Sequence, residues 1–204
     1  MARDGHIHIM GTVGAGKSTL SNLLSGREGI KLLPEPVTSN PYLDDFYKDP
    51  VRNAFPMQVF LMHARFKQAK ENEGKTCIMD MSIYGNDIFA GLMHNSGYMT
   101  EVDLNNYMAV SDSLKSMLDK PAMVVYLKCS VDTAVKRIMK RGRASELNAP
   151  LSYWYDLNNA YEQWYENYND SKKIMIDVAD LDFLTDEADE DYILDIIMEE
   201  YQNA

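Results

Sequence analysis

The feature that most constrains the fold is a pattern near the start of the chain, Gly-x-x-x-x-Gly-Lys-Ser, which runs from Gly11 to Ser18. It follows an apolar run and precedes a segment with helical character, residues 18–24. In this context the pattern predicts a loop whose backbone N–H groups surround phosphate oxygens. Glycines permit the tight turn, and the helix that follows adds its positive N-terminal end. The alternative, a Gly-rich turn without a ligand, does not explain the pattern and its context together.

Nine consecutive residues of this loop are expected to contact a nucleoside triphosphate: Gly11, Thr12, Val13, Gly14, Ala15, Gly16, Lys17, Ser18 and Thr19. Lys17 supplies a positive charge for the β- and γ-phosphates, and Ser18 supplies a hydroxyl for Mg²⁺. The pattern does not specify a reaction, because kinases, GTPases and motor ATPases share it.

Short apolar runs alternate along the chain with longer segments of helical periodicity. Each run has the length of a strand and is almost continuously apolar, which is typical of parallel strands covered on both faces. Five runs fit this description: residues 6–10, 30–33, 76–79, 123–127 and 173–176. The alternation predicts an α/β fold, with a five-stranded parallel sheet flanked by helices.

The segments expected to be helical are residues 18–24, 50–70, 102–117, 131–139 and 152–168. Pro50 stands near the start of its helix, where a missing N–H is tolerated. Pro56 lies further inside the same segment and predicts a kink or a break, because proline cannot donate the helical hydrogen bond.

Length and composition narrow the class of protein. The 204 residues suit a single domain, residues 1–204. The net charge is -11, and the acidic residues between Asp177 and Glu200 predict a solvated terminal helix rather than a nucleic-acid footprint. Cys77 and Cys129 lie in apolar runs and are expected to be buried thiols, as in a reducing cytosol. No apolar run approaches the roughly 18 residues of a membrane helix, so a cytoplasmic protein is expected.

Charged residues follow three of the predicted strands. Glu35 lies just after the second run, and Asp80 ends the third. Ligands of open parallel sheets bind at the carboxyl ends of the strands, so both carboxylates are expected to face the phosphate loop. There a carboxylate can hold Mg²⁺ or accept a hydroxyl proton. A basic cluster after the fourth run predicts a lid over the phosphates, at about residues 137–148.

An ordered set of motifs along most of the chain resembles the deoxynucleoside kinase family. Besides the phosphate loop, it comprises Pro-Glu-Pro-Val (34–37), Phe-Tyr-Lys-Asp-Pro (46–50), Phe-Pro-Met-Gln (55–58), Ser-Ile-Tyr (82–84), Arg-x-x-x-Arg-Gly-Arg (137–143), Pro-Leu (150–151), Ile-Asp (176–177) and Asp-Phe (182–183). The resemblance implies a three-layer P-loop kinase fold. It also implies transfer of the γ-phosphate of ATP to the 5′-hydroxyl of a deoxyribonucleoside.

The resemblance assigns roles on the acceptor side. Glu35 is implied as the general base that takes the proton from the 5′-hydroxyl. Tyr47 and Glu146 match the pair that holds the 3′-hydroxyl of the sugar. Gln58 matches the residue that bonds the edge of the base, and Arg65, seven positions on, matches a base-sensing arginine.

On the donor side, the resemblance implies Asp80 and Ser18 as ligands of Mg²⁺. Lys17 is implied in catalysis, together with the lid residues Arg141 and Arg143. Arg137 and Arg141 are expected to contact ATP. The segment from Asp177 to Phe183, including Asp180, is expected near the adenine.

The sequence departs from the family at two positions. Met81 stands where the family usually has an arginine near the reacting oxygen, and methionine has no charge to offer. Asn86 stands where an Asp usually accompanies the arginine matched by Arg65. Asp87 is adjacent and would take this role if the turn were shifted by one residue.

The resulting expectation is an ATP- and Mg²⁺-dependent deoxynucleoside kinase of nucleotide salvage. A purine substrate is favoured, deoxyadenosine or deoxyguanosine, and a homodimer is implied. Two alternatives remain open: a deoxynucleoside monophosphate kinase, and a non-catalytic nucleotide-binding homologue suggested by Met81.

Overall fold

The computed structural model describes residues 5–37, 39–147 and 149–203. The chain divides into two compact units. Unit 1 consists of Met1–Pro34, Gly74–Met81 and Lys120–Ala204, and unit 2 consists of Glu35–Glu73 and Ser82–Asp119. That residues 1–204 form one domain stays a prediction.

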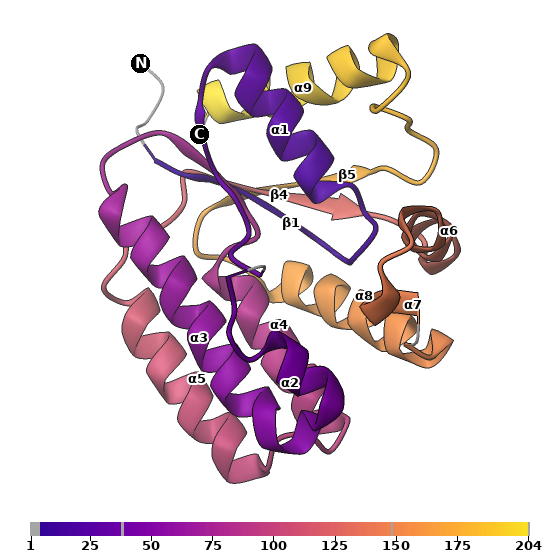
Figure 1. Ribbon diagram of the computed structural model, residues 1–204. Coiled ribbons are helices and arrows are strands. Elements are labelled where there is room, and N and C mark those ends of the chain that lie inside the picture. Colours follow the sequence, from indigo (N-terminus) through magenta and orange to yellow (C-terminus); the bar gives the residue numbers. More distant parts are fainter. Residues whose placement is uncertain (1–4, 38, 148, 204) are drawn as a thin grey trace. The chain divides into compact units, whose positions relative to one another are not determined.

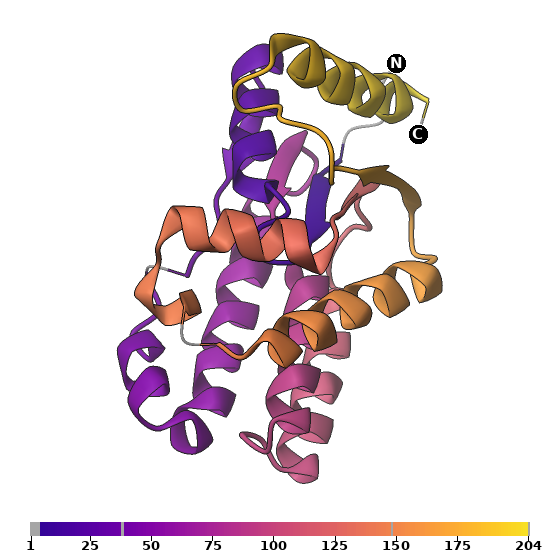
Figure 2. The same ribbon diagram turned by 90° about the vertical axis from the view of Figure 1, so that its right-hand side faces the viewer.

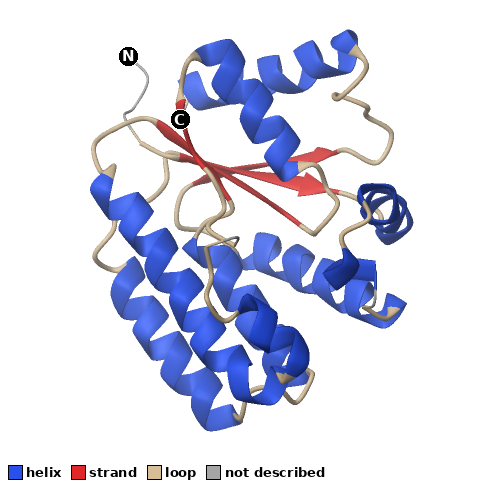
Figure 3. Cartoon of the chain, in the orientation of Figure 1, coloured by secondary structure: helices blue, strands red, loops and turns tan. Residues whose placement is uncertain are grey.

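Unit 1 contains a sheet of five strands in the order β2-β3-β1-β4-β5, and every neighbouring pair is parallel. The strands are β1 (Ile7–Gly11), β2 (Lys31–Leu33), β3 (Cys77–Asp80), β4 (Met123–Lys128) and β5 (Lys172–Asp177), drawn in red in Figure 3. The predicted α/β class and its five parallel strands are therefore confirmed, because nearly continuous apolar runs marked each strand.

Helices lie on both faces of this sheet. The helices of unit 1 are α1 (Lys17–Glu28), α6 (Val131–Arg141), α7 (Ala144–Leu147), α8 (Leu151–Asn167) and α9 (Glu187–Gln202). In Figures 1 and 2, α1 and α9 lie together on one face and α8 lies on the other, which gives three layers.

Alternate strand residues supply the two faces of the sheet. On the α1 and α9 side, Ile9 and Val125 belong to a core with Leu20 of α1 and Ile193 of α9. On the α8 side, the ring of Tyr126 stacks on that of Tyr165, with centroids 5.0 Å apart. This alternation explains why the strands are apolar almost throughout.

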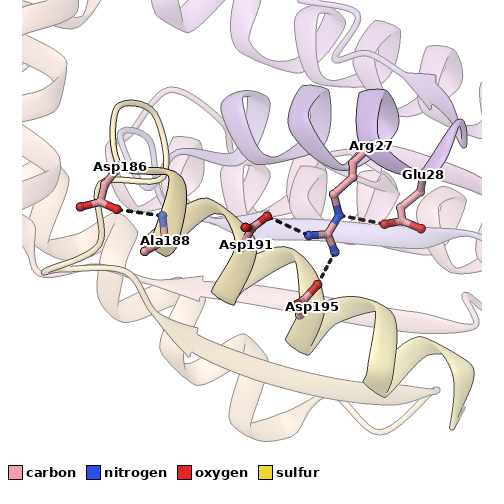
Figure 4. Close-up of polar contacts among 6 residues, drawn as sticks. All are labelled: Arg27, Glu28, Asp186, Ala188, Asp191 and Asp195. Carbon is pink, nitrogen blue, oxygen red and sulfur yellow. Dashed lines mark hydrogen bonds and ion pairs between the residues drawn. The ribbon is translucent and has the colours of Figure 1, made fainter.

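The acidic end of the chain forms a helix, as the composition suggested. Asp186 accepts hydrogen bonds from the N–H groups of Ala188 and Asp189 and so caps the start of α9. Figure 4 shows Arg27 of α1 between Asp191 and Asp195 of α9, with a shortest distance of 2.7 Å to Asp195. Because these groups are partly exposed, each pair contributes only about 0–1 kcal/mol.

Unit 2 is helical. It contains α2 (Leu43–Lys48), α3 (Pro50–Glu71), α4 (Ile83–Asn95) and α5 (Glu101–Lys115). Asp49 caps α3 by accepting from the N–H of Arg52, and Thr100 forms a capping box with Asp103 at the start of α5.

The core of unit 2 joins three helices. Ala54 and Met62 of α3 pack with Ala90 and Met93 of α4 and with Tyr107 of α5. Helix α3 is continuous past Pro56, so a break does not occur there, while a kink at this proline stays a prediction.

Helix α4 was not among the helices predicted from the sequence. Asn86 and Asp87 are consecutive residues of this helix, so their side chains point in different directions. This difference shows which of the two contacts Arg65, as described in the next subsection.

Two further expectations concern cysteines and membranes. Both cysteines are buried free thiols, and burial raises the pKa of each. Among the helices of the described ranges, none has the length and apolar character required to span a bilayer.

Candidate active site

The phosphate loop connects β1 to α1 in unit 1. Gly14 and Gly16 have φ angles of 85° and 96°, a region that other residues rarely adopt. A Cβ atom at Gly14 would lie 2.6 Å from the carbonyl oxygen of Ala134, and one at Gly16 would lie 2.6 Å from the ring of Phe183. The glycines therefore serve close packing of the loop against α6 and against the segment after β5, in addition to the turn.

The start of α1 suits an anion. No side chain caps its first turn, so its N–H groups are left for a ligand. Lys17 is 9% exposed, and its Nζ donates to the carbonyl oxygen of Thr12 at 2.9 Å, within the loop itself. Ser18 follows on the exposed side of the helix.

Asp80 ends β3 beside the strand that leads into the loop. It pairs in register with Ile9 of β1, and its side chain is 5% exposed. Ser18 and Asp80 offer a hydroxyl and a carboxylate oxygen, which are hard donors of the kind that Mg²⁺ prefers when phosphates and water complete its shell. The donor chemistry of these two residues therefore fits magnesium.

Met81 leaves the sheet with an unusual backbone. Its φ is 66°, its N–H donates to the carbonyl oxygen of Ile9 at 3.2 Å, and its sulfur lies 3.8 Å from the hydroxyl of Tyr161. A left-handed conformation at a non-glycine residue costs on the order of 1 kcal/mol, which the surrounding packing must offset.

The first arginine of the lid holds a neighbouring segment. Nη2 of Arg137 donates to the carbonyl oxygens of Val178 and Leu181, at 2.9 and 3.0 Å. Nη1 lies 3.7 Å from the sulfur of Cys129. In this structure Arg137 thus fixes the segment after β5, and its contact with ATP stays a prediction.

The other lid arginines share one carboxylate. Nη2 of Arg141 lies 2.8 Å from both oxygens of Glu146, and Nη1 of Arg143 lies 3.5 Å from Oε1. The segment 137–148 therefore includes an ion-pair cluster formed by the end of α6, by Arg143 and by α7, while Asn148 lies outside the described residues.

The segment after β5 is held by its own hydrogen bonds. Asp177 accepts from the N–H of Ala179 at 3.0 Å, and Asp182 accepts from the hydroxyl of Thr185 at 2.7 Å. That hydroxyl is the main cause of a lowered pKa at Asp182. Phe183 is 4% exposed against Gly16, whereas Asp180 is exposed.

Unit 2 brings Glu35, Arg65 and Asn86 together. Arg65 lies on α3 and is 2% exposed. Its Nη1 donates to Oδ1 of Asn86 on α4, and its Nη2 donates to Oε1 of Glu35 at 2.6 Å. Gln58, on the same helix, is also buried.

Hydrogen-bonding capacity remains in this cluster. In the described part of unit 2, Oε1 of Gln58, Nε of Arg65 and Nδ2 of Asn86 are buried without a hydrogen-bond partner. An unsatisfied buried polar group costs about 1–3 kcal/mol, and such groups mark ligand sites. The hydroxyl of Tyr107 on α5 is also buried without a hydrogen-bond partner among the described residues, and donors and acceptors of this kind suit the edge of a nucleobase.

The structure decides between Asn86 and Asp87. Asp87 accepts from the hydroxyl of Ser111 at 2.6 Å and from Nζ of Lys115 at 2.8 Å, so it faces α5. Burial raises its pKa despite these partners. Asn86 is the residue that contacts Arg65.

Tyr107 belongs to the same cluster, although no motif predicted it as a site residue. Burial raises the pKa of its hydroxyl, the charge of Asp87 adds to the rise, and the charge of Arg65 opposes it. Tyr107 lies on α5 in no recognisable motif, and only helix packing places it here.

The two residues expected at the sugar lie in different units. Tyr47 lies near the end of α2 in unit 2 and is 50% exposed. Its ring packs edge-on against that of Phe46. Glu146 belongs to unit 1. Their joint contact with a 3′-hydroxyl stays a prediction.

A parallel sheet of this order, with a phosphate loop after its first strand, defines a P-loop nucleotide-binding enzyme. The chain belongs to the deoxynucleoside kinase family, phosphotransferases that act on a nucleoside hydroxyl, and the family model matches residues 7–201. The resemblance found in the motifs is thereby confirmed.

Curated relatives cover nearly the whole chain. A deoxyadenosine/deoxycytidine kinase of Bacillus subtilis is 35% identical over 196 residues, which is 94% of this chain and 90% of the relative. A deoxyguanosine kinase of Lactobacillus acidophilus is 35% identical over 208 residues, covering 97% and 91%.

Solved structures agree in fold. Deoxyadenosine kinase from M. mycoides with bound dCTP matches with a TM-score of 0.82 and 34% identity, over 95% of this chain and 99% of that one. The same enzyme with the products dCMP and dCDP matches with a TM-score of 0.83 and 34% identity, over 98% and 100%.

Proposed function

We propose that this deoxynucleoside kinase uses ATP and Mg²⁺ to phosphorylate the 5′-hydroxyl of a purine deoxyribonucleoside. The observation that carries the proposal is the cluster of unit 2. It joins a half-buried carboxylate, Glu35, to buried amide and guanidinium groups with free hydrogen-bonding capacity. These are the two things that a nucleoside acceptor requires, a base for its hydroxyl and polar contacts for its nucleobase.

In the proposed reaction, Glu35 takes the proton of the 5′-hydroxyl as its oxygen forms a bond to the γ-phosphorus. The bond from that phosphorus to the β–γ bridging oxygen breaks, and ADP leaves with the electron pair. Lys17 and the N–H groups at the start of α1 stabilise the phosphate charge, and Arg141 and Arg143 do so from the lid.

Ser18 and Asp80 are proposed to hold Mg²⁺. When bound, the ion neutralises charge on the β- and γ-phosphates. Tyr47 and Glu146 are proposed to hold the sugar 3′-hydroxyl, and Asp177, Asp180 and Phe183 are proposed to lie near the adenine of ATP.

The preference for a purine is supported by relatives that are named deoxyadenosine and deoxyguanosine kinases. Gln58 and Asn86 add amide groups that offer both donors and acceptors. By the same family resemblance, we propose a cytoplasmic homodimer that acts in nucleotide salvage.

The test is an assay with ATP, Mg²⁺ and each of the four common deoxynucleosides, followed by chromatography of the products. We expect 5′-monophosphates, formed most rapidly from deoxyadenosine or deoxyguanosine. Failure to form a monophosphate from any of the four would overturn the proposal. Parallel reactions with deoxynucleoside monophosphates would reveal a monophosphate kinase, and sedimentation of the same sample gives the oligomeric state.

Glu35→Gln is the decisive variant. It keeps the shape and one acceptor oxygen but cannot take a proton, so turnover should fall at least about 100-fold with little change in the KM of ATP. Glu28→Gln, at an exposed position near the end of α1, is the control and should keep full activity.

A further inference from the structure

Arg65 is the charged group at the centre of the unit 2 cluster. One terminal nitrogen, Nη1, bonds to Asn86, and the other, Nη2, bonds to Glu35. A guanidinium is planar, and its donors have fixed directions. Because Asn86 fixes one nitrogen, it also fixes the direction from which the other nitrogen meets Glu35.

The charges around Arg65 make Glu35 its ionic partner. Asn86 is an amide and carries no charge. Asp87, the next residue on α4, is held instead by Ser111 and by Lys115. In the described part of unit 2, the ion pair of Arg65 is therefore the one with Glu35.

This pair is sheltered from water on one side. The side chain of Arg65 is 2% exposed and that of Glu35 is 30% exposed. Charges that are removed from solvent interact more strongly than exposed pairs. A carboxylate at position 86 would contact the same guanidinium, and two anions would then compete for one cation.

We propose that Asn86 and Arg65 are positioning residues for Glu35. Arg65 holds one carboxylate oxygen, so that the other is presented to the hydroxyl proton. Asn86 orients Arg65. Because Asn86 is uncharged, it does not compete with Glu35 for the positive charge of Arg65. The inference rests on the proposed function, since it takes Glu35 as the general base. It adds that residue 86 affects turnover with every nucleobase, beyond any contact of its own with the base.

The test compares Asn86→Asp with Asn95→Asp. Both variants make the same chemical change on α4, but Asn95 is the last residue of this helix and is exposed. For Asn86→Asp we expect kcat to fall roughly tenfold with every deoxynucleoside that the wild type accepts, with the KM of ATP unchanged. Asn95→Asp should leave both kcat and the KM of ATP unchanged.

Asn86→Ala keeps the inference testable if a buried charge prevents folding. It removes the acceptor that orients Arg65 without adding charge. We expect kcat to fall about threefold across the same substrates, with circular dichroism showing a folded protein.

The opposite pattern would overturn the inference. A loss confined to one nucleobase, seen in KM with kcat unchanged, would make Asn86 a contact of the base alone.

The proposed function and the inference can fail separately. If the wild type phosphorylates nothing, the proposed function is lost, and crystal structures of the wild type and of Asn86→Ala still test the pairing without turnover. A lost or lengthened contact between Nη2 of Arg65 and Glu35 in Asn86→Ala supports the inference, and an unchanged contact overturns it.

Discussion

The phosphate loop of unit 1 and the polar cluster of unit 2 are built on opposite principles. The loop is made of backbone, and it is packed from outside by Ala134 and by Phe183 at its glycines. The cluster is made of side chains, and several of its buried atoms still lack a partner. A backbone site recognises what all nucleoside triphosphates share. A side-chain site with unused hydrogen bonds can discriminate among acceptors, at a cost in stability.

The largest effect on kinetics is expected when a side chain is added at a glycine of the phosphate loop. Gly16→Ala would place a Cβ against the ring of Phe183 at a φ that alanine rarely adopts. We expect kcat/KM for ATP to fall about 100-fold, because the N–H groups of the loop are displaced. Steady-state kinetics measures this.

Gly26→Ala is the matched control, inside helix α1 that follows the loop, with nothing within 4 Å of the added Cβ. It should leave kinetics unchanged and raise the free energy of unfolding by about 0.5–1 kcal/mol. Equal kinetic damage in both variants would contradict the account of the loop.

Acid should affect the two units in different ways. Burial, assisted by His6, lowers the pKa of His8 in β1 to about 3. Below pH 6.5, the ordinary pKa of a histidine, His8 binds a proton in the unfolded chain but not in the folded chain. Stability should therefore fall between about pH 6.5 and pH 3, by up to about 1.4 kcal/mol per pH unit.

Thermal melting against pH measures this effect, and His8→Leu should flatten the acid side of the curve. His63→Leu, at an exposed position on α3, is the control and should leave the curve as it is. In unit 2 the raised pKa of Asp87 has the opposite sign, since protonation there relieves burial of a charge. An unchanged acid slope in His8→Leu would contradict the prediction.

Removing an unused acceptor should separate stability from binding. Gln58→Leu replaces the amide whose Oε1 lacks a partner. We expect the KM of the deoxynucleoside to rise about tenfold while the free energy of unfolding does not fall. Gln68→Leu, ten residues along α3, is the control for kinetics. If Gln58→Leu instead destabilised the fold with binding intact, the cluster would be structural.

The smallest effect on kinetics is expected at Arg137, whose hydrogen bonds hold the segment after β5. Arg137→Met removes the donors to Val178 and Leu181. Because Arg137 is only half-buried, we expect the KM of ATP to rise about threefold, with kcat nearly unchanged. Lys136→Met on the exposed side of α6 should have no effect. A loss of kcat alone in Arg137→Met would favour direct contact with the transferred phosphate.

The sequence allowed the loop and the sheet to be predicted for a physical reason. Phosphate recognition by backbone requires glycines at fixed spacing, and a covered parallel sheet requires apolar runs. Both signals are local, and the strands appear within about one residue of the predicted positions.

The rest of the site depends on packing between distant segments. Phe183 meets Gly16, and Asp87 meets Lys115, because helices and loops bring them together. The ion pair of Arg65 with Glu35 follows the same rule, since α3 and the segment after β2 are separate in sequence. The family resemblance named these residues, but it did not show that Arg65 engages Glu35. The roles on the sugar, the adenine and Mg²⁺ stay predictions.

The ion pairs of Glu146 also have a consequence for the arrival of a nucleotide. Arg141 and Arg143 are already oriented by the carboxylate of Glu146. Part of the side-chain entropy that they would lose on binding a triphosphate is therefore lost beforehand. Partly exposed pairs of this kind are weak, about 0–1 kcal/mol each, and a polyanion displaces one carboxylate readily. Under the proposed role of the lid, Glu146 would hold the two arginines in place until the phosphates displace it.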